Sequence, residues 1–589
     1  MSIGSRNRFA IASAAEAVFA TPINITASGV SERLVFTGGT LAAGGTEAIA
    51  YAVISGGVIQ SVYVVHGGSY SVIPTNVVQP AGGSGATFTP VGSGTVTSVT
   101  VGGSGGTGYS VASTGTAKSF PVRMDRPVVN IETATDEDTL TGTLEAGLNS
   151  IVVKQTITAS TELDCRLDAL GILGRFALGN VSRVYLTLLT LNGGTGQVTA
   201  AEVYAVIRDG VAVDYVIANP GSYTTIPTSV TAITGSTNAT FTLSGTTSVT
   251  GVTITAAGAN LNAVASQARL LQFSGGGGSG CVAITKLPTS GSLSAPRAYI
   301  VNGGSGYTSA PTVTVPGGGT GISYTATVSN GVVTALTGSG TSGTAYTNAA
   351  GLYAHTMTVG TGDSPAATLY FQDPFSGFAS TTAHQYAGCN VQRLTLRSEA
   401  GGKITLSAEF LGSGVHTLSQ TITGMPSIST EGILGASRIS QFLIDGTDLK
   451  AYLKSFEITF ENQFDDAAEM ASGSKTLPSI ERIGTTVTGS FTFKADSSVA
   501  GTATDIITAI LGNSTTHLSD AVDISLRIEG VTAGHICDIS IPNAILDNTA
   551  ITGQRGKLEK PVGFKGFYDT VSSRASQLIV ANTTRSYLA

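Results

Sequence analysis

Residues 51–75 read YAVISGGVIQSVYVVHGGSYSVIPT, and residues 204–228 read YAVIRDGVAVDYVIANPGSYTTIPT. Each stretch holds two short runs rich in Val, Ile and Tyr, and a turn sequence containing Gly follows the second run. Alternation of apolar and polar residues is typical of β-strands, and glycine adopts the positive φ angles of tight turns at little cost. This repeated stretch predicts β-hairpins, and it decides the fold class as all-β.

A third copy of the pattern, AYIVNGGSGYTSAPT, begins at Ala298. In every copy a tyrosine follows the turn and a proline stands four residues later; the tyrosines are Tyr70, Tyr223 and Tyr307. One interpretation is that each ring caps a small core. The other is that it lies on the surface of its module, where an aromatic ring could stack on a ligand.

The three copies predict three small β-modules, near residues 45–117, 198–263 and 285–350. Glycine-rich runs lie between them, among them SGGGGSG at 274–280. Such runs are typical of flexible linkers, so we expect them to act as joints. No helical pattern follows the Gly-rich turns, which argues against a phosphate-binding loop.

The composition supports an ordered β-protein of several domains. Only 11% of the 589 residues are charged, while 76 are glycine and none is tryptophan; about 25% is the usual charged share. Disordered chains are rich in charge, which argues against disorder.

The net charge of −7 and the absence of a basic cluster argue against sequence-specific binding of DNA or RNA. No run of 18 apolar residues or signal-peptide core is present, so we expect synthesis in a cytoplasm and no membrane span.

The potential metal ligands and nucleophiles are scattered. No two cysteines lie within four residues of each other, and no two histidines have HxH or HxxxH spacing; the cysteines are Cys165, Cys281, Cys389 and Cys537. Each cysteine is therefore predicted to be an isolated buried thiol. The sequence predicts no metal site, no cofactor and no enzymatic activity, and the nearby pairs His384–Cys389 and His535–Cys537 are interpreted as packing.

A second, fainter repeat lies outside the modules. VKQTITASTELDCRLDALGILGRFALGN covers Val153–Asn180, and VTGSFTFKADSSVAGTATDIITAILGNS covers Val487–Ser514. Each predicts a strand, a polar break and an amphipathic helix that ends in Leu-Gly-Asn, with Gly179 and Gly512 as C-terminal caps. The apolar faces of the two helices are Leu167, Leu170, Leu173, Phe176 and Ala177, and Ile506, Ile507, Ile510 and Leu511. With matching strands on either side, the chain is predicted to repeat one strand–loop–strand–helix–strand–strand unit.

Two stretches resemble a known family. They are FLIDGTDLKAYLKSFEITFENQFDDAAEMASGSKTLPSIERIGTTVTGSFTFKAD (Phe442–Asp496) and SRNRFAIASAAEAVFATP (Ser5–Pro22). They are similar to the tail tube proteins, or major tail proteins, of long-tailed phages. The resemblance covers about 1–42, 118–182 and 351–589. It implies two tandem β-sandwich or barrel-like domains, each with a short flanking helix, into which the three Gly-Tyr modules are inserted.

The implied division of the chain has seven segments. They are 1–42 (N-terminal arm and first strand of tube domain 1), 43–117 (module 1), 118–182 (tube domain 1), 183–263 (module 2), 264–350 (linker and module 3), 351–430 (end of tube domain 1) and 431–589 (tube domain 2 with a C-terminal tail).

The resemblance also implies a function. Subunits of this family form rings that stack into a hollow tube, through which DNA passes without sequence-specific binding, in contact with the tape-measure and other tail proteins. Because the unit is duplicated, we expect three chains per pseudo-sixfold ring, with a hexamer as the alternative. The expected location is the tail of the virion, assembled in the host cytoplasm.

Two long polar loops are candidates for the contact between rings. Their acidic residues are Asp136, Glu137, Asp138, Asp465, Asp466 and Glu469, and the candidate basic partners are Arg555, Lys557 and Lys560. Ordinary solvated charges are the plainer interpretation, because exposed ion pairs contribute little each.

Other function classes stay open. Exposed module tyrosines would suit a receptor- or glycan-binding tail fibre or adhesin, although no coiled-coil or β-helix stalk is visible. A virion decoration protein would need no duplicated unit. A glycan-cleaving enzyme could bring distant Asp and Glu residues together on a β-fold and leave little local pattern.

Overall fold

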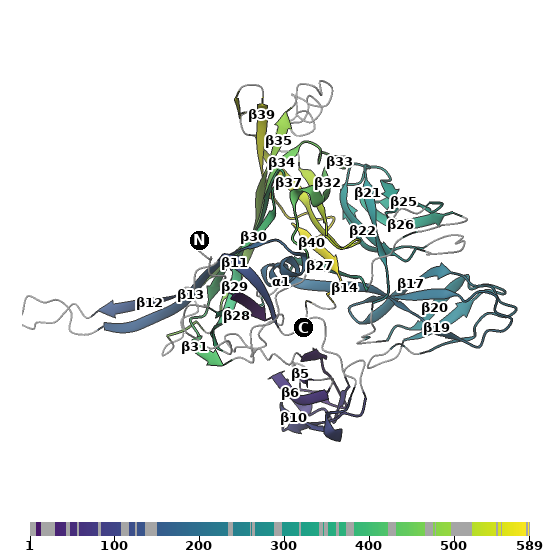
Figure 1. Ribbon diagram of the computed structural model, residues 1–589, viewed down its shortest axis with the longest axis horizontal. Coiled ribbons are helices and arrows are strands. Elements are labelled where there is room, and N and C mark those ends of the chain that lie inside the picture. The colour runs from purple at the N-terminus through teal and green to yellow at the C-terminus, as the bar shows by residue number, and fades with distance from the viewer. Residues whose placement is uncertain are drawn as a thin grey trace, which may run out of the picture.

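The computed structural model describes residues 8–12, 30–42, 48–55, 58–79, 84–107, 117–123, 127–135, 150–231, 233, 239–258, 261, 265–287, 297–316, 320–340, 346, 351–360, 365–372, 382–421, 431–465, 475–477, 479–495, 521–548, 552–554, 557–584 and 587. This part of the chain is almost entirely β, which confirms the predicted fold class (Figure 1). One α-helix, α1 (Leu167–Leu178), occurs among the described residues.

A large antiparallel sheet forms the body of the molecule. Its strands are β1 (Arg8–Ala12), β11 (Ala117–Arg123), β12 (Val128–Thr135), β13 (Ser150–Asp164), β14 (Gly179–Leu188), β16 (Glu202–Arg208), β17 (Val211–Asn219), β27 (Tyr353–Val359), β28 (Ala367–Gln372), β29 (Thr382–Glu399), β30 (Ile404–Gly412), β31 (His416–Thr421), β32 (Ile439–Ile444), β33 (Thr447–Asp448), β34 (Leu453–Asp465), β35 (Glu481–Ala495), β36 (Val522–Glu529), β37 (Ile536–Asn548), β38 (Thr552–Gln554), β39 (Lys557–Gly566) and β40 (Gln577–Asn582). The 3-10 turn η2 (Ala436–Arg438) precedes β32.

Within this sheet, the same order of strand neighbours occurs twice. In the first set, which we call unit 1, the order is β1-β28-β29-β30-β13-β12. In the second set, unit 2, it is β32-β36-β37-β39-β35-β34. Every one of these pairings is antiparallel, and a further pairing of β29 with β34 joins the two units.

The two units also agree in register. Gly412, at the end of β30, lies opposite Ile157 of β13, and Gly566, at the end of β39, lies opposite Val487 of β35. Ile157 therefore corresponds to Val487, and TITAS aligns with TVTGS in the sequence. The similar stretches that begin at Val153 and Val487 are therefore offset by four residues relative to this register.

Helix α1 lies inside the core. All its residues are buried, so the prediction of a single apolar face was wrong. Glycine permits this close packing, because a Cβ on Gly174 would lie 2.5 Å from a methyl carbon of Leu578 in β40. Gly179 ends the helix with φ of 93°, as predicted. The second predicted helix, including Gly512, lies outside the described residues.

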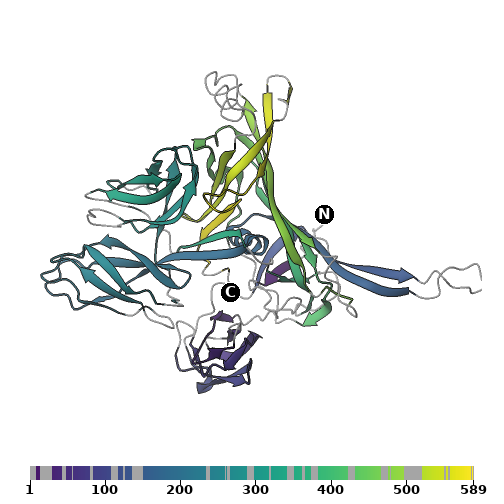
Figure 2. The same cartoon turned by 180° about the vertical axis from the view of Figure 1, so that it is seen from behind.

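One hydrophobic core serves both units. It contains Phe410 from unit 1, Phe491 from unit 2 and Phe176 from α1 in a single cluster of buried side chains. Figure 2, which views the molecule from behind, shows α1 beside the long strands of this sheet. The two units are thus packed together around α1, and they do not form two separate cores.

The three Gly-Tyr segments form further β-structure. Module 1 consists of β2 (Val30–Arg33), β3 (Val35–Thr37), β4 (Thr40–Leu41), β5 (Ile49–Ser55), β6 (Val58–His66), β7 (Tyr70–Val72), β8 (Asn76–Val78), β9 (Thr87–Gly92), β10 (Val96–Gly102) and the turn η1 (Gly103–Gly105). Module 2 consists of the ends of β14, β16 and β17 with β15 (Leu191–Asn192), β18 (Ser229–Val230), β19 (Thr240–Ser244) and β20 (Gly251–Ala256). Module 3 consists of β21 (Arg269–Ser274), β22 (Ser279–Thr285), β23 (Tyr299–Ser305), β24 (Thr312–Thr314), β25 (Ser323–Ser329) and β26 (Val332–Ser339).

The modules begin earlier than the sequence pattern does. Strand β2 pairs with β5, and β3 pairs with β8, so the pairings extend module 1 back to Val30, upstream of the predicted boundary at 43. Similarly, β21 pairs with β22 and β24, so residues 269–274 belong to the sheet of module 3.

The module tyrosines are buried, and their interpretation as surface aromatics was wrong. The exposed fractions of Tyr70, Tyr223 and Tyr307 are 7%, 6% and 3%. The Tyr223 hydroxyl accepts a hydrogen bond of 2.6 Å from the backbone N–H of Ala201, and the Tyr70 hydroxyl accepts one of 2.6 Å from Ala48. The rings of Tyr70 and Tyr307 belong to the buried clusters of modules 1 and 3, and the hydroxyl of the buried Tyr223 is bonded to the backbone of module 2.

Modules 2 and 3 pack firmly on the body. Val206 of module 2, Ile284 of module 3 and Ile579 of β40 share one hydrophobic cluster. The run SGGGGSG at 274–280 is part of this contact, since the backbone N–H of Gly275 donates to the carbonyl oxygen of Gly446 at 3.1 Å. The prediction that this run is a flexible joint was wrong, because its glycines supply close approach and positive φ.

Candidate assembly surfaces

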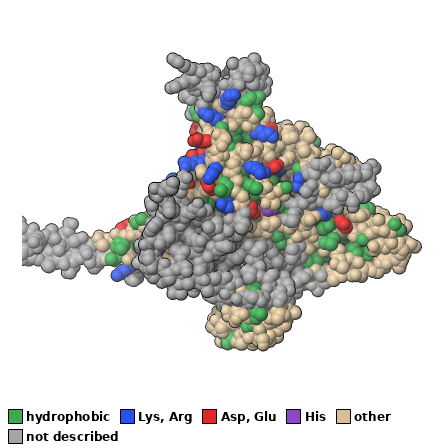
Figure 3. All heavy atoms as spheres, in the orientation of Figure 1, with side chains coloured by type: hydrophobic (Ala, Val, Ile, Leu, Met, Phe, Trp, Pro, Cys, Tyr) green, Lys and Arg blue, Asp and Glu red, His purple; other side chains and the backbone are tan. Residues whose placement is uncertain are grey.

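The main sheet has one apolar and one polar face across β13, β29, β30 and β34. In β30, Leu406 and Phe410 belong to the core, while Ser407 and Glu409 on the opposite face are partly exposed. This alternation is typical of an antiparallel sheet that faces solvent on one side. Figure 3 shows Lys, Arg, Asp and Glu side chains gathered over this part of the molecule, with fewer over the modules.

Charges on the polar face are arranged in opposite pairs. The N–O distances are 3.2 Å for Arg397–Glu162, 2.9 Å for Lys403–Asp164, 3.2 Å for Arg393–Glu409 and 2.6 Å for Arg393–Glu461. These side chains are 36–63% exposed, so each pair contributes little to stability. The main consequence is that the face carries many charges but no strong excess of either sign in this region.

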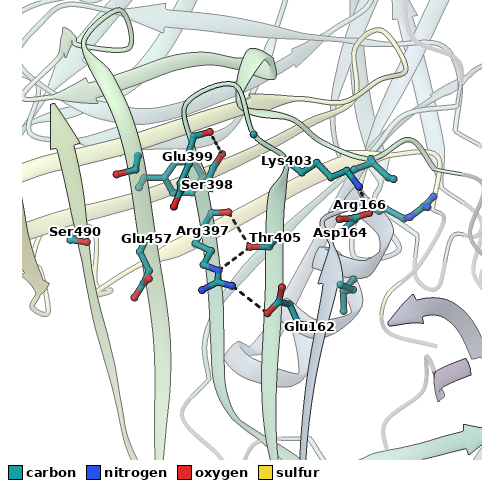
Figure 4. Close-up of a pocket in the computed structure, with 15 residues that line it drawn as sticks. Glu162, Asp164, Arg166, Arg397, Ser398, Glu399, Lys403, Thr405, Glu457 and Ser490 are labelled. Carbon is teal, nitrogen blue, oxygen red and sulfur yellow. Dashed lines mark hydrogen bonds and ion pairs between the residues drawn. The ribbon is translucent and has the colours of Figure 1, made fainter. Parts of the chain in front are cut away.

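A shallow groove runs along this face. Its volume is about 1030 Å³, and it is lined by residues from β13, β29, β30, β34 and β35. In Figure 4, Arg397 points to Glu162 across β30, and Glu457 and Ser490 lie on the neighbouring strands. The groove is polar and open, and it has the character of a solvated wall more than that of a pocket for a small molecule.

The junction between units 1 and 2 is a continuous ladder. Strand β34 pairs with β29 from Glu461–Arg393 to Ser455–Glu399. At its end, the buried side-chain amide of Asn462 donates to the carbonyl oxygen of Ala177 in α1 and to that of Val391 in β29, both at 2.8 Å. Strand pairing and a polar anchor thus hold one unit against the other.

A buried polar seam joins module 3 to unit 2. Arg527 of β36 and Asp538 of β37 form an ion pair of 2.8 Å, and both side chains are 3% exposed. Arg527 also donates to the carbonyl oxygen of Leu271 in β21. Nearby, the Asp523 carboxylate accepts hydrogen bonds from the hydroxyl groups of Ser279 and Ser305 of module 3.

The sequence analysis missed this seam. The signal was present in VDISLRIE (Val522–Glu529), where Asp523 and Arg527 stand in a strand that is otherwise mostly apolar. All eight residues except Glu529 are buried, so neither charge can reach solvent. A charge in an apolar strand predicts a buried partner, but the partner lies far away in the sequence.

Asp523 gives the seam a pH dependence. Burial raises the pKa of Asp523 to about 7, and the ordinary value for aspartate is about 3.9. Between these values the folded chain holds a proton that the unfolded chain releases, so the free energy of unfolding falls as the pH rises. The slope contributed by one group is at most about 1.4 kcal/mol per pH unit.

We expect Asp523→Asn to remove this slope. Thermal unfolding of the wild type and the variant at pH 5 and pH 7 would test it. The stability of the wild type relative to the variant should be greater at pH 5 than at pH 7. A difference that stays constant, or grows with pH, would show that Asp523 is ionised in the folded chain at both pH values.

The predicted ring-contact residues fall mostly outside the described residues. This holds for Asp136, Glu137, Asp138, Asp466, Glu469 and Arg555. Lys557 and Lys560 lie in β39, where only the backbone is described, and Asp465 is the last residue of β34. The described residues therefore do not test this contact, and it stays a prediction.

The four cysteines are buried and unpaired with one another, as predicted. Burial raises the pKa of the thiols of Cys165, Cys281 and Cys537. Among the described residues, no three His, Cys, Asp or Glu side chains come together as a metal site. Nor does any helix in the described ranges have the length and hydropathy to cross a membrane.

Comparison with protein families gives one match. Residues 308–566, which are less than half of the chain, match the family described as phage tail tube protein. The matched segment runs from module 3 through most of unit 2 and includes the β29–β34 junction. This family is structural and not enzymatic. A comparison with curated proteins found no match.

Proposed function

We propose that this chain, whose residues 308–566 match the phage tail tube family, is the subunit of the tail tube, and that copies of it form stacked rings around a channel for DNA. The observation that carries the proposal is the ladder between β29 and β34, which joins the end strand of unit 2 to the half of β29 that β28 leaves unpaired in unit 1. A ring of sheets needs strand pairing from one sheet to the next, because closure removes the unpaired edges.

Units 1 and 2 are proposed to be duplicated tube domains. Their support is the same order of six strands and the same register of Gly412 and Gly566 against the neighbouring strand. If one unit fills one sixth of a ring, three chains complete it. The ring is then threefold in its chains and pseudo-sixfold in its sheets.

The polar face of the main sheet is proposed to line the channel. DNA carries one negative charge per ~1.7 Å of its axis, and a basic wall would bind it and slow its passage. The ion pairs of Arg393 and Arg397 with glutamates reduce the positive charge that this face presents. A wall with paired charges suits passage without binding.

The modules are proposed to lie on the outside of the tube. Module 3 packs on unit 2 through β36 and β37 and leaves the polar face of the sheet open. The polar loops that contain Asp136 and Asp466 are proposed to contact the next ring. Other tail proteins, the tape-measure protein among them, are the expected further partners.

The fibre or adhesin alternative has lost its main support. It depended on exposed rings of Tyr70, Tyr223 and Tyr307, and these rings are buried.

Negative-stain electron microscopy of the purified, concentrated chain would test the tube proposal. Hollow tubes or stacked rings with outward modules are expected. Slender trimers, or monomers at every concentration tried, would contradict it.

A further inference from the structure

The β12–β13 hairpin extends away from the body of the molecule (Figure 1). We propose that this hairpin lies along the end of β37 in a second copy of the chain, in the same way that β34 and β35 of unit 2 lie along β29 within one chain. The inference rests on the proposed tube function, and it identifies the strands and the register of the contact between copies.

The contact within one chain supplies the template. Strand β34 pairs with β35 on one edge and with β29 on the other. Thr459 of β34 forms a hydrogen bond of 2.9 Å with Thr395 of β29, and Asn462 reaches the carbonyl oxygens of β29 and α1. As a result, the exposed fractions of Thr459 and Asn462 are only 9% and 1%.

Strand β12 corresponds to β34 residue by residue. Val128 lies opposite Thr158 in β13, and Thr459 lies opposite Thr488 in β35, so Val128 corresponds to Thr459. By the same count Ile131 corresponds to Asn462, since each lies three residues further along its strand. Both hairpins even have a register shift at the same place, after Glu132 in one and after Gln463 in the other.

The corresponding residues differ in exposure. Val128 and Ile131 are 55% and 53% exposed, although their counterparts in β34 are buried. Strand β12 pairs only with β13 within the described residues, so its second edge is open there. An open edge with exposed apolar side chains is a site for pairing with another strand.

Unit 2 offers the matching edge. Ala544 of β37 pairs with β36 on one side and with β39 on the other, just as Cys389 of β29 pairs with β28 and β30. Strand β29 continues past Cys389, where its pairing with β28 ends, and from Arg393 the same edge pairs with β34. Strand β37 likewise continues past Ala544, where its pairing with β36 ends. No strand of the described chain pairs with this further part of the edge.

Exposed apolar residues lie at the expected end of this edge. Within the chain, the segment after β34 docks on the residue after β30, because the backbone N–H of Leu477 donates to the carbonyl oxygen of Ser413 at 2.9 Å. The residue at the corresponding place in unit 2 is Phe567, after β39. Phe567 and its neighbour Tyr568 are 39% and 62% exposed.

The contact has a direction. Within the described residues, each chain has an open β12 edge and an open β37 edge that differ from each other, so the second copy binds head to tail. Such heterologous contacts form rings when the rotation closes.

The predicted register follows from the pairing of Arg393 with Glu461. Arg393 lies opposite Glu409, three residues before Gly412, and Asp547 lies opposite Gly563, three residues before Gly566, so Asp547 corresponds to Arg393. Asn130 corresponds to Glu461 by the count given above. Asn130 of one copy should therefore lie opposite Asp547 of the next.

Two variants test the contact by charge. Ile131→Glu places a carboxylate in the proposed interface, and Val198→Glu, at a position 81% exposed in module 2, is its matched control. Ile131 is already half exposed in the single chain, so the variant should fold with an unchanged thermal unfolding temperature. We expect the Ile131→Glu variant to lose ring assembly and the control to assemble like the wild type.

A cysteine pair tests the register. Asn130→Cys with Asp547→Cys should form disulfides between chains upon mild oxidation, because directly opposite residues of antiparallel strands have Cβ atoms about 4.5–5.5 Å apart. The control pair, Asn130→Cys with Ser490→Cys, also places one exposed thiol in each unit and should stay unlinked. The native cysteines are buried and should not interfere.

The outcomes separate this inference from the tube proposal. Cross-linked chains with loss of assembly in Ile131→Glu support it. Cross-linked chains that form neither rings nor tubes support the contact and contradict the tube. Ring formation by Ile131→Glu that equals the wild type, together with an Asn130→Cys/Asp547→Cys pair that stays unlinked, overturns this inference and leaves the tube standing. A wild type that does not assemble, together with a cysteine pair that stays unlinked, contradicts both.

Discussion

Replacing Phe491 with alanine is expected to destabilise the common core by about 3–5 kcal/mol, as Phe-to-Ala changes in cores do. Phe491 is fully buried, and its ring centroid lies 4.6 Å from that of Phe442 and 4.9 Å from that of Phe564, with which it is stacked. The variant loses both the buried area and these ring contacts, and it leaves a cavity in the aromatic cluster of unit 2.

Hydrogen exchange is the suitable measurement, because a chain with several packed parts need not unfold in one step. The free energy of opening should fall in peptides from β34, β35 and β39. Leu188→Ala, at a leucine that is 51% exposed at the end of β14, is the control and should change it by less than about 1 kcal/mol. An equally small change in Phe491→Ala would mean that this aromatic cluster does not hold unit 2 together.

Replacing Asp538 with alanine is expected to cost about 3–5 kcal/mol, because it leaves the Arg527 guanidinium as a buried charge without its carboxylate. Burial raises the pKa of Asp538, although Arg527 opposes this, so desolvation of the pair is already a burden in the wild type. The loss should appear in hydrogen exchange of β36, β37 and β21, where module 3 meets unit 2.

An exposed pair provides the control. Arg297 and Asp214 are 3.2 Å apart with side chains 45% and 30% exposed, and Asp214→Ala should cost less than about 1 kcal/mol. The double change Arg527→Met with Asp538→Leu removes both charges and should recover most of the stability. If the double variant is as unstable as Asp538→Ala, the cost comes from packing and not from the unpaired charge.

The all-β class was predictable, because it depends on local patterns of apolar and polar residues. The register between the two matching sets of strands was not. In QTITASTELD, threonine, serine and apolar residues follow each other so closely that several alignments with TTVTGSFTFK fit the sequence. The strand pairing fixes the register, because Gly412 lies opposite Ile157 and Gly566 lies opposite Val487.

Side-chain direction was the other limit. The Gly-Tyr pattern located Tyr223 after a turn but could not show that its ring points inward to meet Ala201. Likewise, the helix pattern found α1 and its cap at Gly179, while complete burial of the helix comes from strands β27, β29 and β40 that are distant in sequence. Local patterns thus predicted the elements, and long-range packing determined their surroundings.

Cryo-electron microscopy of assembled tubes would test the proposed duplication by counting the chains in one ring. We expect three chains per ring and six similar sheets around the channel, with β12 of each chain beside β37 of the next. Six chains per ring, or a ring in which β12 faces solvent, would contradict this expectation.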